Sequence, residues 1–179
     1  MMGTGIMICG LNGVGKSTLG RALAEKLNFY FIDHETLYFP NTDSPDLYTA
    51  PRTHEEAGKI LISELEAHKD FVFTAVKGNY SEPICSLFRY VVLIHAPKEI
   101  RVQRVKDRSF QKFGDRILPG GDLQEQEEHF FDFVQSRPEH LVEDWAQTLN
   151  CPVLRVDGTA PIEDNVWKII EWLQCEPLH

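Results

Sequence analysis

The chain has 179 residues and a formal net charge of −9, from 18 basic and 27 acidic residues. This length suits one domain with a core of its own, and the acidic balance argues against general affinity for nucleic acid. We expect neither a membrane span nor a secretory leader, because no long apolar run or cationic leader stands out. Four widely separated cysteines without a CxxC pair are typical of a cytoplasmic protein.

A glycine-rich motif follows the first predicted strand, Gly5–Cys9, and precedes a predicted helix over 18–27. It matches the phosphate-binding pattern G-x-x-x-x-G-K-[ST], in which backbone N–H groups surround an anion. Lys16 can reach the outer phosphates and the Ser17 hydroxyl can ligate Mg²⁺. The alternative is a strand-to-helix turn that binds nothing. The predicted phosphate-binding residues are Gly10, Leu11, Asn12, Gly13, Val14, Gly15, Lys16, Ser17 and Thr18.

Strands and helices alternate along the rest of the chain. Apolar runs predict strands at 29–32, 71–76, 90–94 and 153–156, with helices at 53–68, 82–88, 97–108, 122–136, 139–148 and 161–173. The pair Thr53 and Glu56 forms a capping-box pattern at one helix start. This alternation predicts an α/β fold with a doubly wound parallel sheet, whose ligands lie beyond the carboxyl ends of the strands.

The long stretch 36–52 contains three prolines and is expected to be irregular, either a binding loop or a disordered one. Its aromatic residues Tyr38, Phe39 and Tyr48 either stack on a planar substrate or pack the loop down. With the helix after it, this stretch forms the expected substrate-binding region, 36–68.

Two acidic residues follow the second strand. Asp33 and Glu35 are two positions apart, so both can point the same way if the segment is extended. One carboxylate could hold the magnesium shell and the other could accept a proton from a substrate hydroxyl. We assign Asp33 to catalysis and metal binding, and which of the two acts as base stays open. The alternative is an acidic turn in which Asp33 caps the next element.

A basic segment, 98–116, holds seven of the 18 basic residues. Arg101, Arg104 and Arg108 are spaced three and four apart and are expected to share one helical face, which could clamp a transferring phosphoryl group. The alternative is a solvated face tethered to the acidic helix after it. Glycines at 114, 120 and 121 favour a mobile helical lid over about 105–137.

Three further cations are candidates for binding a second substrate. Arg52 precedes a helix, Lys77 ends the third strand and Arg137 follows the expected lid. Each alone is more often a surface charge than a ligand. Lys77 follows a core strand directly.

These features together resemble the small P-loop kinases, the group of adenylate, shikimate and gluconate kinases. The resemblance rests on GLNGVGKST at 10–18, on Arg104-x-x-x-Arg108 before a flap, and on the turn at 157–159. It implies a five-stranded parallel sheet, helices on both faces, ATP and Mg²⁺ at the loop, and a closing lid.

The same resemblance implies roles for single residues. Arg104 would pack near the adenine and Arg108 would meet phosphates, while Asp33-x-Glu35 stands where shikimate kinase carries two aspartates. Arg137 is placed like the arginine after the lid. The backbone expected to touch the adenine is that of Asp157, Gly158 and Thr159.

The substrate of the named kinases does not follow from the resemblance. Lys77-Gly78-Asn79 stands where adenylate kinase has Asp-Gly-x-Pro-Arg and shikimate kinase has three glycines. The stretch 108–116 is similar to bacterial proteins labelled only as ATPases or kinases of unassigned substrate.

We therefore expect an ATP-dependent phosphotransferase acting on a small metabolite or nucleotide. The alternative is a regulatory or partner-binding module that binds or hydrolyses ATP without a small-molecule acceptor, and a nucleic-acid end kinase is disfavoured by the acidic charge. Arg116 is a weaker lid candidate. The expected catalytic residues are Lys16, Asp33, Arg104 and Arg108.

Overall fold

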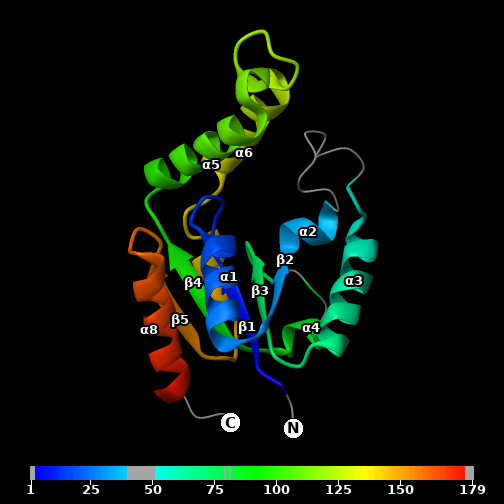
Figure 1. Ribbon diagram of the computed structural model, residues 1–179, viewed down its shortest axis with the longest axis vertical. Helices are drawn as coiled ribbons and strands as arrows, with labels where there is room; N and C mark the ends of the chain where they lie inside the picture. The colour runs from blue at the N-terminus through cyan, green and yellow to red at the C-terminus, as the bar shows by residue number, and fades with distance from the viewer. Residues whose placement is uncertain (1–2, 40–50, 79, 81, 176–179) are drawn as a thin grey trace.

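The computed structural model describes residues 3–39, 51–78, 80 and 82–175. Its centre is a five-stranded parallel sheet in the order β2-β3-β1-β4-β5 (Figure 1). The prediction of a doubly wound parallel sheet is confirmed. Tyr48 and Asn79 lie outside the described residues. The strands are β1 (Gly5–Cys9), β2 (Tyr30–Asp33), β3 (Phe71–Ala75), β4 (Phe88–His95) and β5 (Val153–Asp157).

The three central strands are apolar because both faces of the sheet are covered. Every residue of β1 and β3 is buried, as are all of β4 except Arg89 and His95. Alternate residues of β1 face opposite layers, since Ile8 lies near Gly20 of α1 (Lys16–Leu27) and Met7 lies near Trp145 of α7 (Leu141–Ala146). Helix α8 (Ile162–Cys175) packs beside α1.

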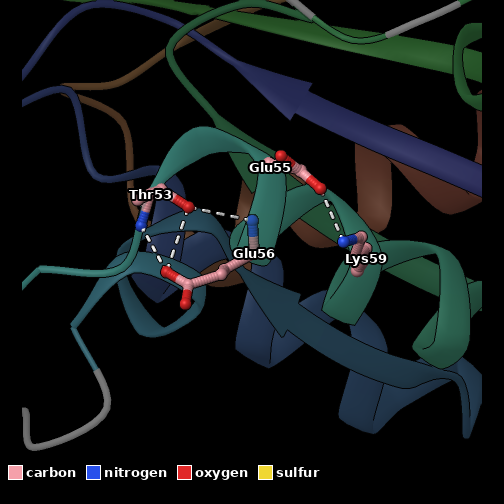
Figure 2. Close-up of polar contacts among 4 residues, drawn as sticks. All are labelled: Thr53, Glu55, Glu56 and Lys59. Carbon is pink, nitrogen blue, oxygen red and sulfur yellow. Dashed lines mark hydrogen bonds and ion pairs between the residues drawn. The ribbon is translucent and has the colours of Figure 1, made fainter.

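Helix α3 (His54–Ala67) begins with the predicted capping box (Figure 2). The Glu56 backbone N–H donates to Thr53 Oγ1 at 3.2 Å, and the Thr53 N–H donates to Glu56 Oε2 at 2.8 Å. An exposed ion pair joins Glu55, in the first turn of α3, to Lys59 one turn later. Such a box typically stabilises a helix by about 1 kcal/mol.

The stretch expected to be irregular instead starts with a short helix, α2 (His34–Tyr38). Asp33 is its N-cap, and Asp33 Oδ1 accepts a hydrogen bond from the Glu35 N–H at 3.1 Å. The extended conformation assumed for Asp33 and Glu35 is therefore wrong, because the carboxylate of the first residue starts a helix that contains the second. A second short helix, α4 (Glu82–Cys85), precedes β4.

A helical hairpin of α5 (Lys98–Phe113), the 3₁₀ turn η1 (Gly114–Ile117) and α6 (Gln124–Ser136) projects beyond the carboxyl ends of the strands (Figure 1). Helix α5 runs past the predicted end at Arg108, because Ser109 and Phe113 continue its buried stripe. Asp122 does not cap α6 and pairs with Arg116 at 2.7 Å. Within the described residues, no helix is long and apolar enough to cross a membrane.

Candidate functional site

The loop between β1 and α1 has the backbone of a phosphate cradle. Gly13 and Gly15 have φ values of 83° and 99°, which L-residues with a side chain rarely adopt. A Cβ at Gly13 would also lie 2.2 Å from the Arg101 carbonyl oxygen, so only glycine fits between the loop and α5. Gly15 is the N-cap of α1 and leaves the first N–H groups of that helix without a side-chain cap. The positive end of α1 therefore faces the loop.

Lys16 begins α1 at the end of the loop, and no acidic partner among the described residues bonds to its ammonium group. Its Nζ donates to the Leu11 carbonyl oxygen at 3.0 Å. Burial lowers the pKa of Lys16 from 10.5 to about 8, Arg108 and Arg137 add to the effect, and Asp33 opposes it. Asp33, Arg108 and Arg137 are thus close enough to Lys16 to affect its charge. A bound anion would restore the ordinary pKa of Lys16.

A cavity of about 360 Å³ opens beside Lys16 at the carboxyl ends of β2 and β3. It brings together predicted residues from three regions of the chain, the loop (Lys16, Ser17), the end of β2 (Asp33) and α5 (Arg108). Its lining is Asn12, Gly13, Lys16, Ser17, Asp33, His34, Glu35, Tyr38, Phe39, Thr74, Ala75, Val76, Arg108 and Phe130.

A second hollow of about 330 Å³ adjoins the first. Ser17, Asp33, Glu35 and Arg108 line both. The second hollow also includes Thr18, the last predicted residue of the phosphate-binding stretch. Asp33 and Glu35 therefore share a site although they do not lie on an extended segment.

Several predicted residues lie outside the cavity lining. Arg52 Nη1 donates to the carbonyl oxygens of Thr36 at 3.2 Å and Leu37 at 2.9 Å, so its charge holds the C-terminal end of α2. Val76 lines the cavity, whereas Lys77 does not. Arg116 pairs with Asp122 on the hairpin.

Arg101 departs from the expected cationic face of α5. Its side chain is 2% exposed and lies behind the phosphate loop. Its Nη1 donates to the Asn12 carbonyl oxygen at 3.3 Å, and its Nη2 pairs with Glu139 Oε1 at 2.6 Å. Arg137 Nη1 donates to Asn12 Oδ1 at 2.9 Å. Asn12 therefore joins both ends of the hairpin to the loop.

The turn at 157–159 is held tightly against the loop. Asp157 Oδ1 accepts the Thr159 N–H at 2.8 Å, and the Gly158 N–H donates to the His95 carbonyl oxygen at 2.6 Å. A Cβ at Gly158 would lie 2.7 Å from the Val14 carbonyl oxygen. Arg104 Nη1 donates to the Gly158 carbonyl oxygen at 2.9 Å. Two predicted adenine contacts, Arg104 and this turn, are thus neighbours.

Five lining residues were not assigned to the site from sequence: His34, Thr74, Ala75, Val76 and Phe130. His34 Nδ1 shares a hydrogen bond of 2.5 Å with the Tyr80 hydroxyl, and burial lowers the pKa of His34 while Asp33 opposes this. Thr74 is 1% exposed, and its Oγ1 has no hydrogen-bond partner among the described residues. His34 could have been found from its position between the two acids, and Thr74 from its place at a strand end. Phe130, in α6, carries no local signal.

The residues present fit a Mg²⁺ ion held jointly with a triphosphate. The Ser17 hydroxyl and the Asp33 carboxylate line the same two hollows, and Mg²⁺ prefers one or two carboxylates together with phosphate oxygens and water. Among the described residues, no group of three or more His, Cys, Asp or Glu could hold a metal by itself.

Comparisons with known proteins agree with this architecture. The protein YqaC of Bacillus subtilis (strain 168), described as uncharacterized, is 29% identical over 176 residues, covering 94% of this chain and 96% of YqaC. Shikimate kinase from Acinetobacter baumannii, in complex with shikimate, gives a TM-score of 0.58 at 19% identity over 98% of this chain and 96% of that one.

Two further solved structures have the same fold. A sugar kinase from Janibacter sp. HTCC2649 has a TM-score of 0.55 at 17% identity, over 96% of this chain and 95% of that one. Deoxyadenosine kinase from M. mycoides has a TM-score of 0.53 at 16% identity, over 97% of this chain and 100% of that one.

The family model described as an AAA domain matches residues 6–127, which is more than half of the chain. The chain therefore belongs to the AAA domain family and has a P-loop kinase-like fold.

Proposed function

We propose that the protein is an ATP-dependent phosphotransferase acting on a small molecule. The observation that carries this proposal is the cavity in which Lys16, Asp33 and Arg108 surround a chamber next to the phosphate loop. A module that only binds ATP has no need of such a chamber. The kinase-like fold supports the same reading.

The phosphates of ATP would lie in the loop 10–18, on the N–H groups at the start of α1. Lys16 and Arg108 would neutralise the charge that develops on the transferring phosphoryl group. Mg²⁺, held by Ser17 and by Asp33 through water, supplies further positive charge when bound. The adenine would lie near Arg104 and the turn formed by Asp157, Gly158 and Thr159.

The acceptor would occupy the cavity with a hydroxyl beside Asp33. That carboxylate takes the hydroxyl proton, the acceptor oxygen forms a bond to the γ-phosphorus, and the bond to the β–γ bridging oxygen breaks to leave ADP. Glu35 lies in the same cavity and would orient the acceptor. Arg52 would not touch the substrate. It would instead hold the C-terminal end of α2, the helix that lines this side of the cavity.

The hairpin would act as a lid over residues 105–137, closing when ATP and acceptor are bound. Closure excludes water, which would otherwise hydrolyse ATP. Arg137, now held by Asn12, would move onto the phosphates. Arg116 would keep η1 and α6 together through Asp122 and not reach the substrate.

The test is ADP release with Mg-ATP in the presence and absence of pooled alcohols. Acceptor-dependent ADP that disappears in Lys16→Ala, with the fold intact by circular dichroism, supports the proposal. ADP release at one rate whether or not an acceptor is present contradicts it and identifies an ATPase or regulatory module. Arg89→Ala, at a position outside the site, is the matched control.

A further inference from the structure

We infer that the acceptor is an uncharged alcohol carrying a planar ring, of which nucleosides are the commonest kind. This inference rests on the proposed phosphotransfer and names the substrate class of the same cavity. It follows from the aromatic and the charged residues that line the chamber.

Aromatic residues from two elements line the cavity. His34, Tyr38 and Phe39 come from α2 and the residue after it, and Phe130 comes from α6 of the hairpin. Flat aromatic walls favour a planar ligand, because stacked rings gain about 0.5–1.5 kcal/mol beyond burial. An acyclic polyol makes no such contact.

The rings of α2 are held in place by hydrogen bonds made behind the cavity. Tyr38 shares a hydrogen bond of 2.5 Å with His54 Nδ1, and His34 shares one of 2.5 Å with the Tyr80 hydroxyl. The His54 and Tyr80 rings are themselves stacked, with centroids 6.2 Å apart. Side chains that are fixed in this way lose little conformational entropy when a flat ligand binds to them.

Among the described residues of 33–80, no basic side chain lines the cavity. Residues 33–80 carry nine acidic and four basic residues. Of the basic ones, Arg52 holds backbone carbonyls of α2, Lys59 pairs with Glu55, and Lys69 and Lys77 are not among the lining residues.

Among the described residues, the basic ones that line this cavity are Lys16 and Arg108, and the proposed function places both on the phosphates of ATP, whereas Arg21 and Lys112 line only the adjoining hollow. The acidic residues Asp33 and Glu35 line both hollows. A carboxylate or phosphate on the acceptor would therefore lie near like charges, which costs several kcal/mol. Hydroxy acids, sugar phosphates and nucleoside monophosphates are disfavoured on this ground.

The experiment compares kcat/KM for four sets of acceptors with Mg-ATP: nucleosides, their 5′-monophosphates, hydroxy acids including shikimate and gluconate, and acyclic polyols. We expect kcat/KM to be about 100-fold higher for a nucleoside than for its 5′-monophosphate, because the two differ only in the anionic phosphate group. ATP binding is measured separately by calorimetry.

The outcomes separate the two proposals. Preference for a monophosphate, a hydroxy acid or a polyol overturns the inference and leaves the phosphotransferase intact. If ATP binds and no acceptor in any set raises ADP release, the proposed function and the inference both fail.

Variants test the aromatic wall directly. Tyr38→Leu and Phe130→Leu should raise the acceptor KM about tenfold with no change in the ATP dissociation constant. Tyr38→Phe keeps the ring and should lose less than Tyr38→Leu. Phe110→Leu, an exposed aromatic of α5 outside the cavity, is the control and should change neither constant. Equal effects of Phe110→Leu and Phe130→Leu would contradict a direct contact.

Discussion

Arg137 Nη1 donates to the Asn12 side-chain oxygen at 2.9 Å, which connects the residue after α6 to the phosphate-binding loop. If Arg137 moves onto the phosphates when ATP binds, this bond exists only without nucleotide. The two residues should therefore be coupled in one state and independent in the other.

A double-mutant cycle on Asn12→Ala and Arg137→Ala measures this coupling. In the free protein, the interaction contribution to the free energy of unfolding should be about 0.5–2 kcal/mol. With a saturating non-hydrolysable Mg-ATP analogue it should fall to near zero. If the coupling is as large in the nucleotide complex as in the free protein, Arg137 does not move from Asn12 to the phosphates.

Asp33→Asn separates the chemistry of Asp33 from its role as helix cap. Asparagine caps as well as aspartate, so the free energy of unfolding should change by less than about 0.5 kcal/mol. Turnover should fall about 10²–10⁴-fold, because the amide accepts no proton. Asp33→Ala, by contrast, should also lose about 1 kcal/mol of stability. Equal losses of turnover and ATP affinity in Asp33→Asn would rule out a role as base.

Lys16 should make ATP binding depend on pH. Its pKa is about 8 in the free protein and 10.5 ordinarily, so between these values the folded chain binds fewer protons there than the unfolded chain. This group's contribution to stability therefore rises with pH across that window. A bound triphosphate returns the proton, and binding at pH 8 should take up about half a proton.

Calorimetry in two buffers of different ionisation enthalpy measures the proton uptake. Uptake should approach zero at pH 6.5 and grow through pH 8.5, and the affinity should fall above pH 8. In Lys16→Arg the cation stays charged throughout, so the uptake assigned to this position should vanish. If wild type and Lys16→Arg took up the same number of protons, the uptake would belong to a group other than Lys16.

Glu127 weakens the hairpin. It is 1% exposed in α6, and its Oε2 has no hydrogen-bond partner within the part of the chain that the structure describes. Glu127→Leu removes an unsatisfied buried carboxylate and should raise the free energy of unfolding by about 1–3 kcal/mol in denaturant titrations. Gln126→Leu, at an exposed position of the same helix, should stay within about 0.5 kcal/mol. A loss of stability in Glu127→Leu would show that the carboxylate is bonded in solution.

The sheet and the phosphate loop follow from local sequence. The apolar runs of β1 and β4 fit strands buried on both faces, and the loop motif specifies its own backbone through glycines such as Gly13. The capping box of Thr53 and Glu56 was predicted from two residues alone, since its hydrogen bonds are made within one turn.

What the sequence did not reveal depends on tertiary packing. The spacing of Arg101, Arg104 and Arg108 describes a helix surface but not what covers it, and the loop covers Arg101. Phe130 meets the cavity only because the hairpin folds over from a distant part of the chain. The site roles of Lys16, Asp33 and Arg108 remain predictions that the experiments above test.

The apolar contacts between α5 and α6 form a cluster of Val102, Val105 and Val134, separate from the core around the sheet. Rotation of the hairpin can therefore leave the packing around the sheet unchanged. Substitutions in this small cluster should alter the stability of the hairpin itself, while substitutions under β1 and β4 should alter how often the whole chain unfolds. Selection can thus tune the stability of the hairpin and that of the sheet independently.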